Sequence, residues 1–496
     1  MSSFFPEKRC NAMFTWIEKT KVMHFVLSGD AMAFFYGIFL FLYELKFFRE
    51  RISLVHPVLI GWAGIVIVYH VILRKKWKTI PYWKCLAAFS ICAGITALIN
   101  YQAGLMSNIK SWVMVVLPLW SFFSVCIDVK EEDKTKKMLT VLSGAAVVIF
   151  VASVTAVCMF LVRYHDMVSL WGVEDFVGVL FLKVNSTMTT TILYGLYVDS
   201  NHAAAYSIIF AIYSLILLNA IYKGSFKSKI VIICGKIFAV VNFVVQLCFF
   251  PLANSRGGWL SLAVASFAVA FLFFFHQRFC ARKAVTIRAL LSLFASVAIG
   301  LMICAGLVAV RNGMSLFSAS VSSQMTSQEE KESTDNDDVE VDSFEKADDG
   351  TGSGRLTIWK DAVELFVRKP LFGTGPGNNQ YYAAKYAVAQ NKIAKGTAVH
   401  NSYLELLVGY GVLGTVPLLG FWLMCLFAVC KQAIFSERRN RLDFNMTFIA
   451  VLFASGVSAL LSCIFVTTTA MYYIMLLMTG FLVGPSEHAL DKESAV

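Results

Sequence analysis

Charged side chains are scarce in this chain: they make up 15% of its 496 residues, whereas ordinary soluble domains carry about 25%. Hydrophobic residues account for 58% and aromatic residues for 14%. So much apolar surface needs lipid around it, which excludes an ordinary soluble protein. The composition therefore predicts an all-α, polytopic integral membrane protein.

Other features are also missing. The polar segment through Lys21 is not followed by a short apolar core and a small-residue cleavage site, so we expect no cleavable signal peptide. Of the 12 cysteines, almost all lie in apolar segments and none in the long hydrophilic loop, which predicts no disulfide framework and no CxxC metal site. No group of His, Asp and Glu has metal-ligand spacing, so we expect no metal.

Apolar stretches long enough to cross a bilayer recur along the chain, since a spanning helix needs about 20 such residues. We predict about twelve spans: Val26–Leu45, Leu54–Leu73, Cys85–Tyr101, Trp112–Cys126, Met138–Val162, Ala203–Ile221, Ile230–Phe250, Trp259–Phe275, Ala289–Val310, Ser402–Val429, Met446–Ile464 and Val466–Val483. The clusters of Lys and Arg between them fall on one side, apart from Arg49 and Arg51, so both termini are predicted to be cytoplasmic. The excess of Lys and Arg that cytoplasmic loops carry explains the net charge of +11, so we expect no nucleic-acid partner.

Three regions follow from this topology. Residues 1–310 carry the first nine spans, residues 311–400 form a long extracytoplasmic loop, and residues 401–496 carry the last three spans and a cytoplasmic tail. A shorter loop, Arg163–His202, is predicted on the same outer side. Within the long loop, residues 329–349 contain eleven acidic residues against two Lys, which predicts a disordered insert rather than a calcium loop, because the EF-hand spacing is missing.

The second half of the long loop, residues 355–400, has a different character. Apolar residues at three- and four-residue spacing, such as Leu356, Trp359 and Val363, predict an amphipathic helix that Pro370 ends. A glycine-rich turn, Gly373–Asn378, follows. Such a turn can cradle phosphate, but no strand precedes it and no Gly-Lys-Ser/Thr follows, so a turn that only redirects the chain is favoured.

Three cationic or titratable residues lie at predicted outer membrane boundaries: Arg256, Arg355 and His400. Each has a structural alternative when taken alone, because Arg256 could snorkel and His400 could simply precede a helix that Ser402 and Glu405 start as a capping box. Two arginines and a helix N-terminus together suit a phosphate or pyrophosphate, and a neighbouring His can act as a general base.

The motifs around these residues resemble the O-antigen ligase and polymerase superfamily. The resemblance is carried by Arg355 through Trp359, Pro370–Asn378, His400-Asn-Ser-Tyr-Leu-Glu405 and Gly409–Gly414, and upstream by Ser255-Arg256-Gly257 and Asp199–His202. It covers about the C-terminal 60% of the chain and does not separate ligases from polymerases.

The resemblance implies a GT-C-like glycosyltransferase in the bacterial cytoplasmic (inner) membrane that needs neither metal nor nucleotide-sugar cofactor. Its donor would be a glycan on undecaprenyl pyrophosphate. The catalytic residues of the family map onto Arg256, Arg355 and His400. Among the other motif residues, four are predicted to contact substrate: Asn201, Asn378, Asn401 and Glu405.

The predicted reaction is an inverting, metal-independent displacement in which His400 takes a proton from an acceptor hydroxyl and the two arginines stabilise the departing lipid pyrophosphate. The acceptor could be a glycan, a lipid or a protein. The alternative is a transporter or flippase of lipid-linked oligosaccharide, which would need polar residues inside the membrane. Asp30 and Asn242 are candidates for that role, but the chain shows no clear internal repeat.

Overall fold

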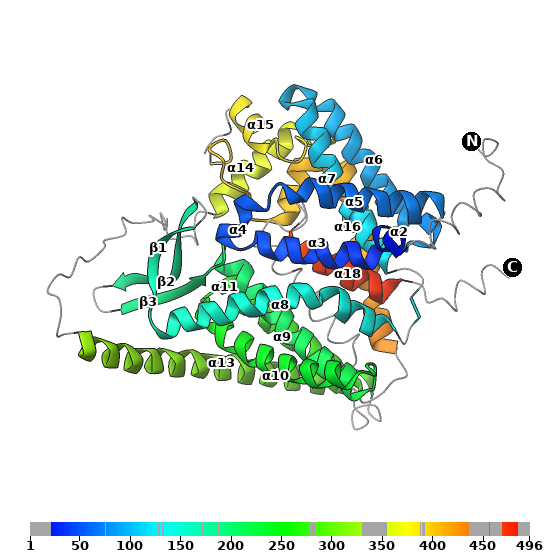
Figure 1. The fold of residues 1–496 in the computed structure, drawn as a ribbon. Coiled ribbons are helices and arrows are strands. Elements are labelled where there is room, and N and C mark those ends of the chain that lie inside the picture. Colours follow the sequence, from blue (N-terminus) through cyan, green and yellow to red (C-terminus); the bar gives the residue numbers. More distant parts are fainter. Residues whose placement is uncertain are drawn as a thin grey trace.

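The computed structural model describes most of the chain, and its segments are residues 21–74, 76–126, 129–130, 133–170, 173–185, 188–276, 284–329, 355–386, 388, 392–435, 456 and 469–484. The protein is a bundle of helices with one small sheet (Figure 1). Most of the acidic segment 329–349, from residue 330 onward, lies outside the described residues. The tail after residue 484 lies outside them too.

The described helices follow the apolar stretches of the sequence. They are α2 (Lys21–Val26), α3 (Gly29–Tyr43), α4 (Lys46–Arg51), α5 (Val55–Ile67), the π-helix η1 (Val68–Leu73), the 3-10 helices η2 (Lys76–Thr79) and η3 (Tyr101–Ala103), α6 (Trp83–Ile99), α7 (Leu105–Val125), α8 (Lys134–Leu161), α9 (Ser200–Tyr222), α10 (Lys229–Leu252), α11 (Arg256–His276), α13 (Val285–Glu329), α14 (Arg355–Arg368), α15 (Asn379–Lys385), α16 (Ser402–Phe435) and α18 (Ala470–Val483).

These helices confirm the predicted polytopic membrane fold. Eight described helices are long and apolar enough to cross a membrane, and three shorter apolar helices accompany them. Each predicted span outside residues 446–464 coincides with one of these helices. That remaining span lies, except for Gly456, outside the described residues.

Helix α18 forms the centre of the bundle, and its residues from Ala470 to Leu482 are all buried. Its Tyr473 donates a hydrogen bond to the carbonyl of Ala33 in α3, 2.8 Å away. Gly37, one turn further along α3, permits this contact, because a Cβ there would lie 2.5 Å from the Tyr473 hydroxyl. Helix α18 is therefore packed against protein on every side, unlike a lipid-facing helix.

Helix α13 is longer than the span predicted within it. It continues without a break to Glu329, so residues 311–329, which we expected to open the long loop, are helical. In Figure 1 this helix extends past its neighbours on the side where the sheet lies. Arg311 donates a hydrogen bond to the Asn254 side chain, 3.1 Å away, and so fastens α13 to the turn between α10 and α11.

The segment predicted as the shorter outer loop contains a three-stranded antiparallel sheet in the order β1 (His165–Leu170), β2 (Val173–Asn185) and β3 (Met188–Gly195). Lys46 of α4 holds the sheet to the bundle. Its buried ammonium lies 3.3 Å from an oxygen of Asp175 and donates to the carbonyl of Phe176. We call the end of the bundle that carries this sheet the sheet end.

Candidate active site

His400 lies where the chain enters α16 at the sheet end. Its φ of 53° is left-handed, a conformation that costs a residue with a Cβ of order 1–3 kcal/mol. The following residue, Asn401, caps α16: its side-chain oxygen accepts hydrogen bonds from the backbone N–H groups of Tyr403 at 3.0 Å and Leu404 at 3.1 Å. The strained backbone of His400 is therefore held by the start of a long helix.

The predicted capping box is wrong, although α16 begins at Ser402 as expected. Asn is as strong an N-cap as Ser, and Asn401 lies one residue earlier, so it takes that role. Glu405 instead accepts a hydrogen bond from the Asn379 amide, 2.8 Å away, at the start of α15. These contacts favour structural roles for Asn401 and Glu405, and their contact with substrate stays a prediction.

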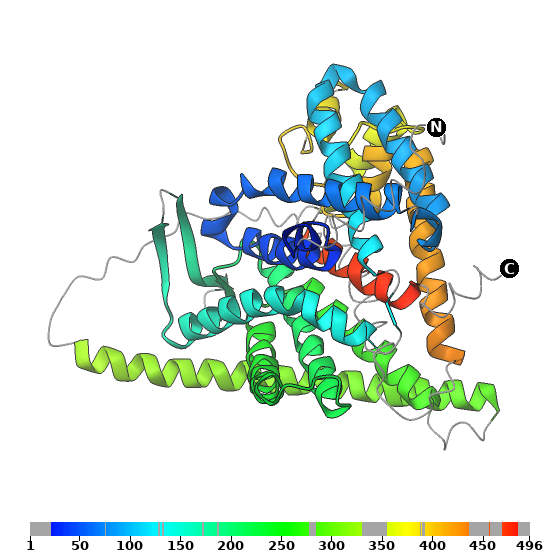
Figure 2. The ribbon, with the colours of Figure 1, turned by 45° about the vertical axis from the view of Figure 1, so that its right-hand side comes forward.

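Arg355 is the first residue of α14, as predicted. Trp359, one turn later on the same face of this helix, donates its indole N–H to the carbonyl of Val399, 3.2 Å away. Figure 2 shows α14 and α15 together at one edge of the bundle, beside the hairpin of α6 and α7. The start of α14 is thereby held next to His400.

Charged groups from several elements act on the ring of His400. Burial lowers the pKa of His400 below its usual 6.5, and the Arg355 guanidinium lowers it further. The Asp199 carboxylate raises this pKa, and His202 lowers it. A neutral imidazole is the form that can accept a proton, so the site favours the base form of His400 near neutral pH.

Arg256 begins α11 and is exposed to solvent. The preceding residue, Ser255, is buried, and its hydroxyl accepts the Gly258 N–H at 2.9 Å and donates to the Asn201 side chain at 2.9 Å. The turn that presents Arg256 is therefore fastened to the first turn of α9.

Asp199 caps α9 and completes this connection. One of its oxygens accepts the backbone N–H of Asn201 at 2.7 Å and the side-chain amide of Asn201 at 3.0 Å. A chain of side chains thus runs from the Arg256 turn to Asp199, whose charge acts on His400. The structure brings Arg256, Asn201, Arg355 and His400 to one end of the bundle.

A further pair was not predicted from the sequence. Glu44, at the end of α3, lies with one oxygen 3.4 Å from the Nδ1 atom of His202 and accepts a hydrogen bond from Tyr206 at 2.8 Å on the other. His202 belongs to the upstream motif, but Glu44 is 158 residues away and carries no local signal. Only the folded chain joins them.

Residues 241–419 match the family model described as O-Antigen ligase. The match contains Arg256, Arg355 and His400, while Asn201 and Glu44 lie upstream of it. Over these residues the chain is similar to the O-antigen ligase family, in agreement with the resemblance of its motifs.

A relative of this O-antigen ligase-like chain is a protein of Haemophilus influenzae (strain ATCC 51907 / DSM 11121 / KW20 / Rd) described as an uncharacterized protein. It is 25% identical over 223 residues, which are 44% of this chain and 48% of the relative. The chain thus spans about half the length of the curated relative that it matches.

The glycine-rich turn in the ligase-like region pairs with a break in α16. The N–H of Thr374 donates to the carbonyl of Val408 at 2.8 Å and that of Gly375 to Gly409 at 2.8 Å, while Gly411 is non-helical. Because these amide groups are used within the protein, the turn is not a free phosphate cradle at these positions.

Asn378 ends the same turn and is buried. Its amide donates to the Asn108 side chain at 2.7 Å and to the carbonyl of Thr374 at 3.0 Å. These contacts favour a structural role, and its contact with substrate stays a prediction. In the part of the chain that the structure describes, no group of three or more His, Cys, Asp and Glu side chains could hold a metal ion.

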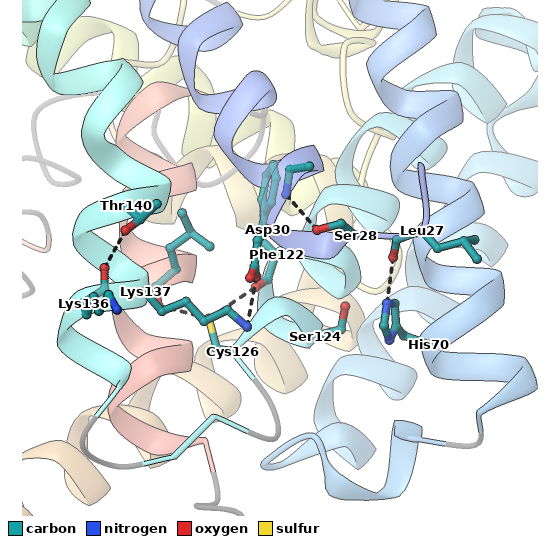
Figure 3. Close-up of polar contacts among 12 residues, drawn as sticks. Leu27, Ser28, Asp30, His70, Phe122, Ser124, Cys126, Lys136, Lys137 and Thr140 are labelled. Atoms are coloured by element: carbon teal, nitrogen blue, oxygen red, sulfur yellow. Dashed lines mark hydrogen bonds and ion pairs between the residues drawn. The ribbon is translucent and has the colours of Figure 1, made fainter. Parts of the chain in front are cut away.

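Asp30 and Asn242, the polar residues considered for a transporter, are both paired. Asp30, at the start of α3, lies 3.0 Å from the ammonium of Lys137 (Figure 3). The start of α3 lies at the end of the bundle opposite the sheet (Figure 1). Asn242, inside α10, donates to the Phe210 carbonyl at 3.0 Å and to Ser214 at 2.8 Å. Both arrangements suit helix packing and anchoring in a membrane.

Proposed function

We propose that the protein is a glycosyltransferase that moves a glycan from undecaprenyl pyrophosphate to an acceptor hydroxyl on the outer face of the bacterial cytoplasmic membrane. The observation that carries the proposal is the position of His400. It lies in a strained conformation beside Arg355 at one end of an apolar helical bundle, in a ligase-like region. A lipid-linked donor reaches such a site from the bilayer, and a hydrophilic acceptor reaches it from water.

In the proposed reaction, neutral His400 removes the proton of the acceptor hydroxyl as its oxygen attacks the anomeric carbon of the donor glycan. The new bond between oxygen and carbon forms while the bond from that carbon to the pyrophosphate oxygen breaks. The electron pair leaves with the pyrophosphate, and Arg256 and Arg355 stabilise its charge. Attack opposite the leaving group inverts the anomeric centre.

The distribution of charge supports the proposed side of the membrane. The connections at the end opposite the sheet carry the basic residues Lys134, Lys137, Lys223 and Lys229, among others. Cytoplasmic loops carry an excess of Lys and Arg, so this end is assigned to the cytoplasm. The sheet end, with His400, then faces outward.

A transporter is the alternative from another functional class. It would use polar groups within the membrane to bind its substrate, whereas Asp30 and Asn242 are engaged by neighbouring side chains or backbone. Transport alone also leaves the cluster around His400 unexplained. Both observations support the enzyme.

Replacing His400 with Ala in the native host tests the proposal. Loss of long glycans with single repeats retained on the membrane would identify a polymerase, and accumulation of complete chains on the lipid carrier would identify a ligase. His24→Ala is the matched control, because His24 is exposed on α2 at the opposite end of the bundle. Unchanged glycans in the His400 variant, at normal protein level, would refute the enzyme.

A further inference from the structure

A general base beside a pyrophosphate faces an electrostatic problem. The negative charge of the bound group stabilises a proton on a nearby imidazole, and a protonated imidazole cannot act as a base. Positive charges close to the base counter this effect. Arg355 is one such charge, but it is also the group that is expected to bind the pyrophosphate itself, which neutralises it.

In the pair formed by Glu44 and His202, the ring supplies the second positive charge, because His202 acts on His400. The Glu44 side chain is 13% exposed and that of His202 is 29% exposed, so both are largely shielded from water. Their contact at 3.4 Å directs the Nδ1 atom of His202 toward the carboxylate. A carboxylate in this position fixes the orientation of the ring and stabilises a proton on it.

Two further contacts hold this pair rigidly. Tyr206, one turn along α9 from His202, donates its hydroxyl to the second oxygen of Glu44 at 2.8 Å. The backbone carbonyl of Glu44 accepts the N–H of Val198 at 3.0 Å. The end of α3 and the start of α9 are therefore locked together at the carboxylate, and the ring of His202 has little freedom to turn away.

We propose that Glu44 and His202 are a second charged pair of the site, in which Glu44 positions the ring and the positive ring keeps His400 neutral while pyrophosphate is bound. The inference rests on the proposed function of His400. Glu44 and His202 are positioning residues in this role, because they act through His400 and not on the reacting atoms.

The groups that face His400 come from several elements. Arg355 on α14 and His202 on α9 disfavour a proton on its ring, and Asp199 before α9 favours one. The Glu405 carboxylate of α16 is directed at Asn379. Removing His202 or Asp199 should therefore shift the titration of His400 in opposite directions.

The test is a titration of His400 by NMR in the full chain, labelled at histidine and held in phospholipid nanodiscs. The signal is assigned as the one missing from His400→Gln, and inorganic pyrophosphate is the probe. With pyrophosphate present, His202→Gln should raise the titration midpoint by about half to one pH unit, the size expected of one charge acting over several ångströms. Glu44→Gln should raise the midpoint of His400 as well, because His202 then loses the carboxylate that stabilises its proton.

Asp199→Asn should lower the midpoint, because Asn keeps the helix cap but removes the negative charge. His24→Gln is the matched control and should leave it unchanged. If His202→Gln and Glu44→Gln both leave the midpoint where it is in the unaltered protein, the inference is wrong. Because the titration does not require glycan transfer, this result is separate from the activity of His400→Ala, which decides the proposed function.

Discussion

Trp359 and Val399 are joined by a hydrogen bond of 3.2 Å from the indole N–H to the backbone carbonyl. The bond links the helix that Arg355 begins to the residue before His400. His400 holds a left-handed backbone conformation. The Val399 carbonyl directly precedes it, so a hydrogen bond to this carbonyl can fix the orientation of His400. The proposed base and the proposed anion-binding arginine are thus positioned by one contact.

Replacing Trp359 with Phe removes this hydrogen bond and keeps most of the apolar contact. A net loss of about 1 kcal/mol should lower kcat roughly five-fold, with KM for the lipid-linked donor little changed. Initial rates in proteoliposomes measure both constants. Trp120→Phe is the control, since its indole donates to Ser90 at 2.9 Å, away from the site. Equal rates for the two variants would contradict a role for Trp359 in positioning His400.

The pH dependence of the rate should reflect the titration of the His400 ring. Burial and Arg355 lower its pKa below 6.5, and a base is active only when it is deprotonated. Activity is therefore retained above this pKa and lost as the pH falls through it. The acid limb of the rate profile should lie below pH 6.5, and Arg355→Gln should move it upward. A limb above pH 6.5 in the unaltered protein would assign the titration to another group.

Arg355→Lys separates charge from geometry. Lys keeps the positive charge, so the acid limb should stay close to its original position. It cannot reproduce the paired N–H groups of the guanidinium, so binding of the pyrophosphate should weaken and the rate fall about ten-fold or more. Rates measured over the same pH range give both quantities. A fully active Lys variant would show that the bidentate contact is not used.

The membrane helices could be predicted because hydropathy is a property of short stretches of sequence. Hydropathy marks where lipid-facing residues stop and not where a helix stops, so the continuation of α13 from Arg311 to Glu329 was missed. Residues after Arg311 are more polar, yet up to Glu329 they contain no proline and one glycine, Gly313, so a helix can continue through them. The sheet was missed for a similar reason, since its strands lie in a segment interpreted only as a loop.

The site was predicted in part, because Arg256, Arg355 and His400 lie in recognisable motifs at helix boundaries. Glu44 was not, since it lies near the end of the predicted apolar span Val26–Leu45 and meets His202 only when the bundle folds. The cap of α16 was assigned to Ser402 because the pattern of Ser402 and Glu405 fits a capping box. Asn401 competes equally well for that role, and a local pattern does not decide between them.

The break in α16 gives the last prediction. Gly411 has φ 62° and ψ −170°, a region open almost only to glycine. A Cβ there would lie 2.3 Å from the Leu371 carbonyl oxygen, so Gly411→Ala must push the segment that leads into the glycine-rich turn away from α16. We expect it to destabilise the protein by more than about 2 kcal/mol, seen as a lower Tm in detergent.

Gly420→Ala in the same helix is the control for this change. Nothing lies within 4 Å of a Cβ at Gly420, so that variant should be as stable as the unaltered protein or slightly more stable. Because the turn also bonds to Val408 and Gly409 just beyond the start of α16, the Gly411 variant should lose activity along with stability. If Gly411→Ala unfolds at the same temperature as Gly420→Ala, the turn does not depend on this break.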